Sequence, residues 1–182
     1  MQYLIKTLYI SIMLIVGSHL AGCATNTDAV SAIKASKLEI YEVHHDGRIH
    51  VFYDRKLYKE FLSLGETAYR LTRIGAGPNG ETLVFGLTKK DKKMKKPVAA
   101  IELYDGKVKQ DSIYAEMRKH DRIYVFNSFN DMGTVRLFGH PNYMFTQIGA
   151  GPKGETIVFV LNKKNKKKRP DALIAEYKKH NS

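Results

Sequence analysis

Ile74 to Lys90 reads IGAGPNGETLVFGLTKK, and Ile148 to Lys164 reads IGAGPKGETIVFVLNKK. The two stretches lie 74 positions apart and are identical at 13 of 17 positions. Similarity at one fixed period is the signature of internal repetition. We therefore predict a tandem duplication, with a first repeat over residues 37–110 and a second repeat over residues 111–182.

The first repeat is predicted to begin with a β-hairpin. The β-rich segments 38–43 and 48–53 flank Asp46-Gly47, and Asp-Gly between two such segments is a strong hairpin signal. A second pair of strands is expected at 69–74 and 82–87, on either side of the glycine-rich loop. Residues 98–104 fit either a helix or a strand.

A helix is expected between the two strand pairs. Tyr58, Phe61 and Leu64 are spaced for one helix face, and Asp54 has the side chain of an N-cap. Gly65 is placed to end the helix in a left-handed conformation. With a short helix after the second strand pair, each repeat reads as ββαββα.

The second repeat follows the same plan, because its apolar positions recur at the same offset. Ile123, Val125 and Phe126 replace Ile49, Val51 and Phe52 in the first hairpin, and Met132, Val135 and Phe138 replace the apolar face of the helix. Residues 170–179 read as a closing helix, with Pro170 near its first position.

The size of one repeat bears on how the repeats pack. A unit of about 72 residues buries little of its surface and is only marginally stable alone. We therefore expect an α+β fold in which both repeats pack as one pseudo-symmetric body. Two separately folded units on a short link are the alternative.

The first 22 residues have the layout of a secretory signal. Lys6 precedes an apolar run at 8–16, which is too short to span a bilayer as a helix, and small residues follow. The segment closes with Leu20-Ala21-Gly22-Cys23. Cys23 is the sole cysteine of the chain, so no internal disulfide can form.

This ending resembles the lipobox of bacterial lipoproteins, and all four positions fit. The resemblance implies a signal peptide over 1–22, cleavage before Cys23, and acyl chains such as palmitate on that cysteine. Residues 23–36 then form an acylated tether that holds the protein at the membrane. Ala24 stands where aspartate would retain the protein at the inner membrane, which implies the outer membrane. An ordinary buried role for Cys23 is the alternative.

The positive charge is concentrated in two lysine tracts. The chain carries a formal charge of +12, and loss of Lys6 with the leader leaves +11. The tracts at 89–96 and 163–169 carry +5 and +6, which accounts for the whole of it. The candidate anion-binding residues are Lys89, Lys90, Lys92, Lys93, Lys95, Lys96, Lys163, Lys164, Lys166, Lys167, Lys168 and Arg169.

Two interpretations of these tracts remain open. Near an anionic surface each cation contributes about 1 kcal/mol, which suits anionic lipid, lipopolysaccharide or another polyanion. Lysine-rich turns also keep sheet edges soluble without binding anything.

The glycine-rich loops match G-x-G-x-x-G twice, but a β-rich segment follows each loop. A dinucleotide site requires a helix there, since the helix N-terminus holds the pyrophosphate. Pro78 and Gly80 suit a type I turn, so we interpret both loops as hairpin turns.

Other functional signatures are weak. His44, His45 and His50 are interpreted as solvent-facing, and no metal site or cofactor is expected. The chain has no G-x-S-x-G or H-E-x-x-H motif, and its acids are scattered beside lysines. Tyrosine and phenylalanine among basic residues suit nucleic acid only weakly, because most lie at recurring core positions.

These observations predict a lipid-anchored lipoprotein of the cell envelope that acts as a non-catalytic binding or assembly module. An envelope enzyme acting on cell-wall or lipid material is the alternative. The sequence does not single out a protein partner, or decide between the periplasm and the cell surface.

Overall fold

The computed structural model describes residues 37–93, 96–108 and 112–182. These residues form a mixed α/β fold with one eight-stranded sheet and four α-helices. The predicted leader and tether, with Cys23, lie outside the described residues. None of the described helices is long and apolar enough to cross a bilayer.

The elements follow one another in a regular order along the chain. The first half contains β1 (Leu38–His45), β2 (Arg48–Phe52), α2 (Arg55–Leu64), β3 (Arg70–Arg73), β4 (Thr82–Gly86), the 3₁₀ turn η1 (Asp91–Lys93) and α3 (Ala99–Tyr104). The second half contains β5 (Ile113–Lys119), β6 (Arg122–Phe126), α4 (Phe129–Phe138), β7 (Tyr143–Gln147), β8 (Thr156–Leu161) and α5 (Asp171–Asn181).

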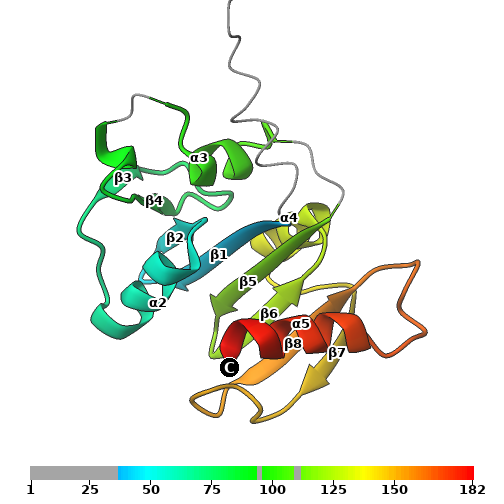
Figure 1. The fold of residues 1–182 in the computed structure, drawn as a ribbon. Helices are drawn as coiled ribbons and strands as arrows, with labels where there is room; N and C mark the ends of the chain where they lie inside the picture. The colour runs from blue at the N-terminus through cyan, green and yellow to red at the C-terminus, as the bar shows by residue number, and fades with distance from the viewer. Residues whose placement is uncertain (1–36, 94–95, 109–111) are drawn as a thin grey trace, which may run out of the picture.

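The two halves meet in the middle of the sheet, whose strand order is β3-β4-β2-β1-β5-β6-β8-β7. β1 and β5 lie side by side and run parallel, with Leu38 opposite Ile113 and Val43 opposite Arg118 (Figure 1). Within each half the hairpin strands pair antiparallel, and β2–β4 and β6–β8 pair parallel. The halves therefore share one sheet and are not separate units.

These pairings define two ends of the sheet. β1 and β5 begin at the end where β4 and β8 finish, and we call this end the lysine rim. The opposite end carries the hairpin turns at 46–47 and 120–121, and we call it the turn rim.

Helices cover both faces of the sheet. On one face, α2 and α5 pack over an apolar cluster that includes Tyr41, Tyr114 and Phe159. On the other face, α3 and α4 pack over a cluster that includes Ile40 and Phe85. Figure 1 shows α5 in front of the sheet and α4 behind it.

Several local predictions are confirmed. Asp46 and Gly47 form the β1–β2 turn with positive φ of 49° and 68°. Asp54 caps α2 by accepting the Leu57 N–H at 2.9 Å, and Gly65 ends it at φ 78°. Residues 99–104, which fitted either structure, are helical in α3.

The last residue of each predicted apolar helix face is exposed and not buried, so the prediction is wrong at these two positions. Tyr58 and Phe61 are buried, but Leu64 is 72% exposed, and Phe138 of α4 is 64% exposed. Both residues share the face of the buried side chains one turn earlier. Each ends its helix directly before a left-handed glycine, beyond the side chains that cover the earlier turns.

Gly86 offers a test of how tightly the first half is packed. A Cβ at Gly86 would lie 2.5 Å from the Phe52 ring, which is 1% exposed and cannot move aside. Gly86→Ala should therefore reduce the free energy of unfolding by about 1–3 kcal/mol, measured by urea denaturation. Gly133→Ala in α4 meets no atom within 4 Å and should stabilise by about 0.5–1 kcal/mol. Equal stability of the two variants would contradict this packing.

Candidate functional site

Both lysine tracts leave the sheet at the lysine rim. The first follows β4 and includes η1, and the second follows β8. β4 and β8 are separated by five inter-strand steps, so the tracts begin about 24 Å apart. The structure thus brings together at one end of the molecule two segments that lie 74 residues apart in sequence.

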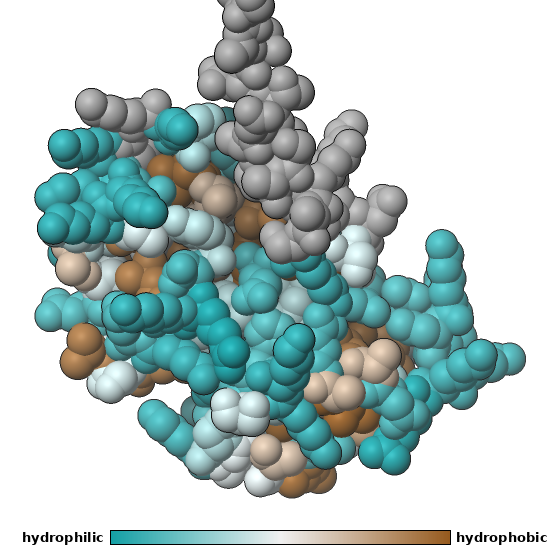
Figure 2. Space-filling model, in the orientation of Figure 1, coloured by the Kyte–Doolittle hydropathy of each residue, from teal (hydrophilic) through white to brown (hydrophobic). Residues whose placement is uncertain are grey.

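The tract cations that the structure describes are all exposed. Figure 2 shows hydrophilic side chains projecting over η1 and over the loop that follows β8. Lys95 lies outside the described residues. The exposed cations are Lys89, Lys90, Lys92, Lys93, Lys96, Lys163, Lys164, Lys166, Lys167, Lys168 and Arg169.

A polar turn fixes the start of each tract. Asp91 accepts the Thr88 N–H at 3.1 Å, and Asn165 accepts the Asn162 N–H at 2.7 Å. Asp91 also accepts the Tyr53 hydroxyl at 2.6 Å. Burial favours a higher pKa for Asp91, but the hydrogen bonds from Thr88 and Tyr53 outweigh it and lower the pKa. The Asp91 carboxylate is therefore ionised, and its hydrogen bonds hold the turn together.

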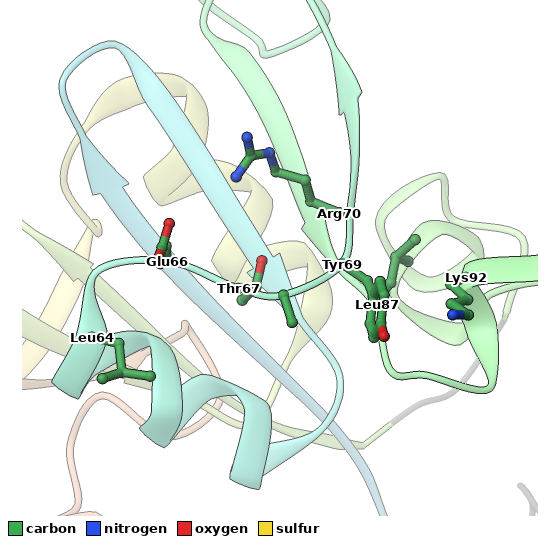
Figure 3. Close-up of a pocket in the computed structure, with 8 residues that line it drawn as sticks. Leu64, Glu66, Thr67, Tyr69, Arg70, Leu87 and Lys92 are labelled. Atoms are coloured by element: carbon green, nitrogen blue, oxygen red, sulfur yellow. The ribbon is translucent and has the colours of Figure 1, made fainter.

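One lysine of each tract lies on a tyrosine ring. The Lys92 ammonium is 4.8 Å from the ring centre of Tyr69, and the Lys166 ammonium is 4.3 Å from that of Tyr143. Figure 3 shows Tyr69, Leu87 and Lys92 together on one side of an open hollow of about 710 Å³. Such cation–π contacts orient the tracts and leave the ammonium groups accessible.

Few carboxylates neutralise the tracts. Among the described residues, the ion pair that involves a tract cation is Arg169 with Asp171, at 3.1 Å. Both side chains are more than 60% exposed, so this pair contributes little. The tracts therefore present concentrated positive charge to solvent.

A first buried carboxylate ties α4 to β1. Glu42 is fully buried and accepts the Arg136 Nε–H at 2.7 Å. Its other oxygen lies 3.1 Å from His44 Nε2. Burial acts to raise the pKa of Glu42, but the Arg136 charge and both hydrogen bonds outweigh it and lower the pKa. Arg136 is also stacked over Tyr104 at 4.6 Å, which links α3 to the same network.

A second buried carboxylate ties α2 and α5 to β5. Glu116 is 1% exposed and accepts the Tyr114 hydroxyl at 2.6 Å and the Asn181 side-chain amide at 2.7 Å. It also accepts the Tyr58 hydroxyl from α2 at 3.2 Å. Tyr58 in turn accepts a hydrogen bond from Arg118 at 2.9 Å. This network fastens two helices to one strand.

The two buried carboxylates were not singled out from the sequence. Glu42 and Glu116 lie 74 residues apart, inside apolar strand segments, which is the signal that marks them. Neither residue lines the hollow beside Lys92 or the hollow at the hairpin turns 46–47 and 120–121. Their hydrogen bonds join sheet to helices, so their geometry is structural.

The interpretation of the histidines is correct for one residue. His45 has a 73% exposed side chain beside Asp46. The side chain of His44 is 8% exposed, against Glu42, and His50 packs on Phe61 at 4.5 Å between ring centres. Burial lowers the pKa of His50 to about 4. His50 lies on the opposite sheet face from His44, because His50 pairs with Val43.

The glycine-rich loops are hairpin turns, as predicted. In the first loop Gly80 donates its N–H to the Gly77 carbonyl at 3.1 Å, and β4 follows. Glu81 accepts the Asn79 N–H at 2.8 Å, and a Cβ at Gly77 would lie 2.6 Å from the Glu81 carboxylate. The second loop repeats these contacts with Glu155 and Gly151. A side chain at Gly77 or Gly151 would therefore collide with the glutamate carboxylate that closes each turn.

Comparison of the chain with protein-family models, curated proteins and solved structures finds no match.

The Glu42–Arg136 pair predicts a pH-dependent effect of Arg136→Met. This variant leaves a buried carboxylate without its cation and should cost about 3–5 kcal/mol at pH 7, measured by urea denaturation. In the wild type the pKa of Glu42 is lowered, so its stabilising contribution is present above about pH 4.5 and is lost on acidification. In the variant burial raises that pKa, so the deficit should narrow as the pH falls through 4.5.

Arg73→Met is the matched control, because Arg73 pairs with Asp105 at 2.7 Å near the surface. It should cost less than about 1 kcal/mol. An Arg136→Met deficit that is small, or equal at pH 4 and pH 7, would contradict the charge pairing.

Proposed function

We propose that this protein is an envelope lipoprotein whose lysine rim lies against an anionic surface, such as lipid headgroups or lipopolysaccharide phosphates. One observation carries the proposal. β1 starts at the rim where β4 and β8 end, and the predicted tether joins the chain directly before β1. The point where the predicted tether enters the sheet therefore lies at the same end as both tracts.

The lengths involved are compatible with this arrangement. Residues 24–36 reach at most about 45 Å when extended, so the anchor leaves the rim within contact distance of the membrane. Each cation near an anionic surface contributes about 1 kcal/mol, screened over about 10 Å at 0.1 M salt. The acyl chains would hold the protein at the surface, and the tracts would set its orientation.

We further infer that the two halves arose by duplication and form a pseudo-twofold body. The proposed axis runs along the strands between β1 and β5. Such a rotation keeps each end of the sheet in place and exchanges its faces, which accounts for α2 and α5 on one face and α3 and α4 on the other. An axis perpendicular to the sheet would make β1 and β5 antiparallel and send the tracts to opposite ends.

The alternative of an envelope enzyme has less support. Acid–base chemistry needs a carboxyl or imidazole group that meets substrate in a pocket. The buried Glu42 and Glu116 are engaged with helices, and the exposed cations at the lysine rim favour binding.

The lysine rim predicts salt-sensitive vesicle binding by the chain that begins at Ala24, which keeps the whole sheet and both apolar clusters. The variant Lys90→Gln, Lys163→Gln, Lys164→Gln should bind vesicles rich in phosphatidylglycerol about 100-fold more weakly at 50 mM salt, measured by co-sedimentation. The matched control replaces Lys59, Lys178 and Lys179, three exposed helix lysines, and should change binding less than threefold. Equal losses in both variants, or binding that ignores salt, would refute the proposed surface.

The anchor itself is tested separately by metabolic labelling. Radiolabelled palmitate should enter the wild-type polypeptide and not the Cys23→Ser variant, which should also retain its leader. A wild-type chain without label would exclude the lipobox assignment and leave the vesicle result unaffected.

A further inference from the structure

The turn rim carries a cleft of about 970 Å³ that the proposed membrane surface does not use. Since β1 and β5 are parallel neighbours, their hairpin turns at 46–47 and 120–121 lie side by side at this end. β1 has eight residues, so the cleft lies about 26 Å from the lysine rim.

The lining of this cleft contains five lysine and arginine side chains and four carboxylates, a formal excess of one positive charge. Asp46 is 3.0 Å from His45, and Glu81 accepts backbone N–H groups of its own loop. Glu155 pairs with Arg118. Asp121 is the remaining acid of the lining. Four further lining cations make no ion pair within the described residues, and they are Arg48, Lys119, Arg122 and Lys153.

Arg118 is an ordered donor in the wall of the cleft, and Glu155 balances its charge. Its side chain is 17% exposed, and it donates from Nε to the Tyr58 hydroxyl and from Nη1 to Glu155. Its Nη2 makes no hydrogen bond to any described residue. A guanidinium that is already ordered loses little entropy when it binds a phosphate oxygen.

The turn beside Arg118 has the same left-handed backbone as the β1–β2 turn but contains no glycine. His120 and Asp121 both have positive φ, of 51° and 56°, where the β1–β2 turn uses Asp46-Gly47. Left-handed backbone costs a residue with a side chain roughly 1–2 kcal/mol. Non-glycine residues in such conformations cluster at functional sites, and aspartate and histidine are among those that adopt them most often. In the β1–β2 turn, Gly47 adopts this backbone conformation without that cost.

We propose that the turn-rim cleft binds a small molecule that bears a pyrophosphate or phosphomonoester group. The charges of Arg48, Lys119, Arg122 and Lys153 surround the cleft, and Arg118 supplies a directional donor. This site is independent of the lysine rim. If both sites operate, the protein holds a phosphorylated ligand at the end of the sheet that faces away from the membrane.

Inorganic pyrophosphate is the probe, titrated into the isotopically labelled chain that begins at Ala24. Amide NMR shifts of residues 44–48 and 118–122 should saturate along one binding curve. The double variant Arg48→Gln, Arg122→Gln should lower the affinity at least tenfold, and Arg118→Lys should lower it while preserving the charge. The lysine-rim variant Lys90→Gln, Lys163→Gln, Lys164→Gln should bind as the wild type does.

Shifts that do not saturate, or that fall on tract residues and spare the turns, would overturn the proposal. Unchanged affinity in the double variant would overturn it as well. The amide spectrum of each variant shows directly whether the sheet is intact, and Arg118→Lys tests the cleft if the double variant is misfolded.

Discussion

The parallel pairing of β1 with β5 is the constraint on which the rest of the structure depends. It joins the two halves into one sheet through six registered residue pairs, from Leu38 opposite Ile113 to Val43 opposite Arg118. Because the two strands run the same way, elements at corresponding positions of the two halves lie at the same end of the sheet. The lysine tracts share one rim for this reason, and the hairpin turns share the other.

The two middle strands also carry the two buried carboxylates of the described residues. Glu42 on β1 and Glu116 on β5 serve opposite faces, and each holds helices through side chains far away in sequence. Burying carboxylates costs solvation energy that only well-formed hydrogen bonds recover, so such networks specify geometry more than they add stability. The networks thereby fix the helices over a sheet whose ends remain free for contact.

Local structure followed from local sequence signals. Asp46-Gly47, Asp54 and Gly65 act through backbone preferences and neighbouring hydrogen bonds, so the first hairpin and the limits of α2 were predictable. The glycine loops were also predictable, since the β-rich segment after each loop excluded a phosphate-binding helix. The exposure of Leu64 and Phe138 was not, because periodicity gives the face of a helix and not how far the core extends beneath it.

The features that bring the candidate sites together depend on long-range pairing. No local pattern shows that β1 pairs with β5 and runs parallel to it, so neither the common rim of the tracts nor the cleft at the turns could be derived from the sequence. The partner of Glu42 lies 94 residues away, which is equally invisible to local patterns. The tract residues themselves were identifiable from charge alone, and the structure adds where they lie.

The most direct test of the shared rim is hydrogen–deuterium exchange on the acylated protein in vesicles that contain anionic lipid. Contact of the lysine rim with the membrane should slow exchange at residues 86–93 and 161–169 relative to neutral vesicles and leave exchange at the turns 46–47 and 120–121 unchanged. Protection of those turns with unchanged exchange at the lysine tracts would place the opposite end of the sheet on the membrane and contradict contact through the lysine rim.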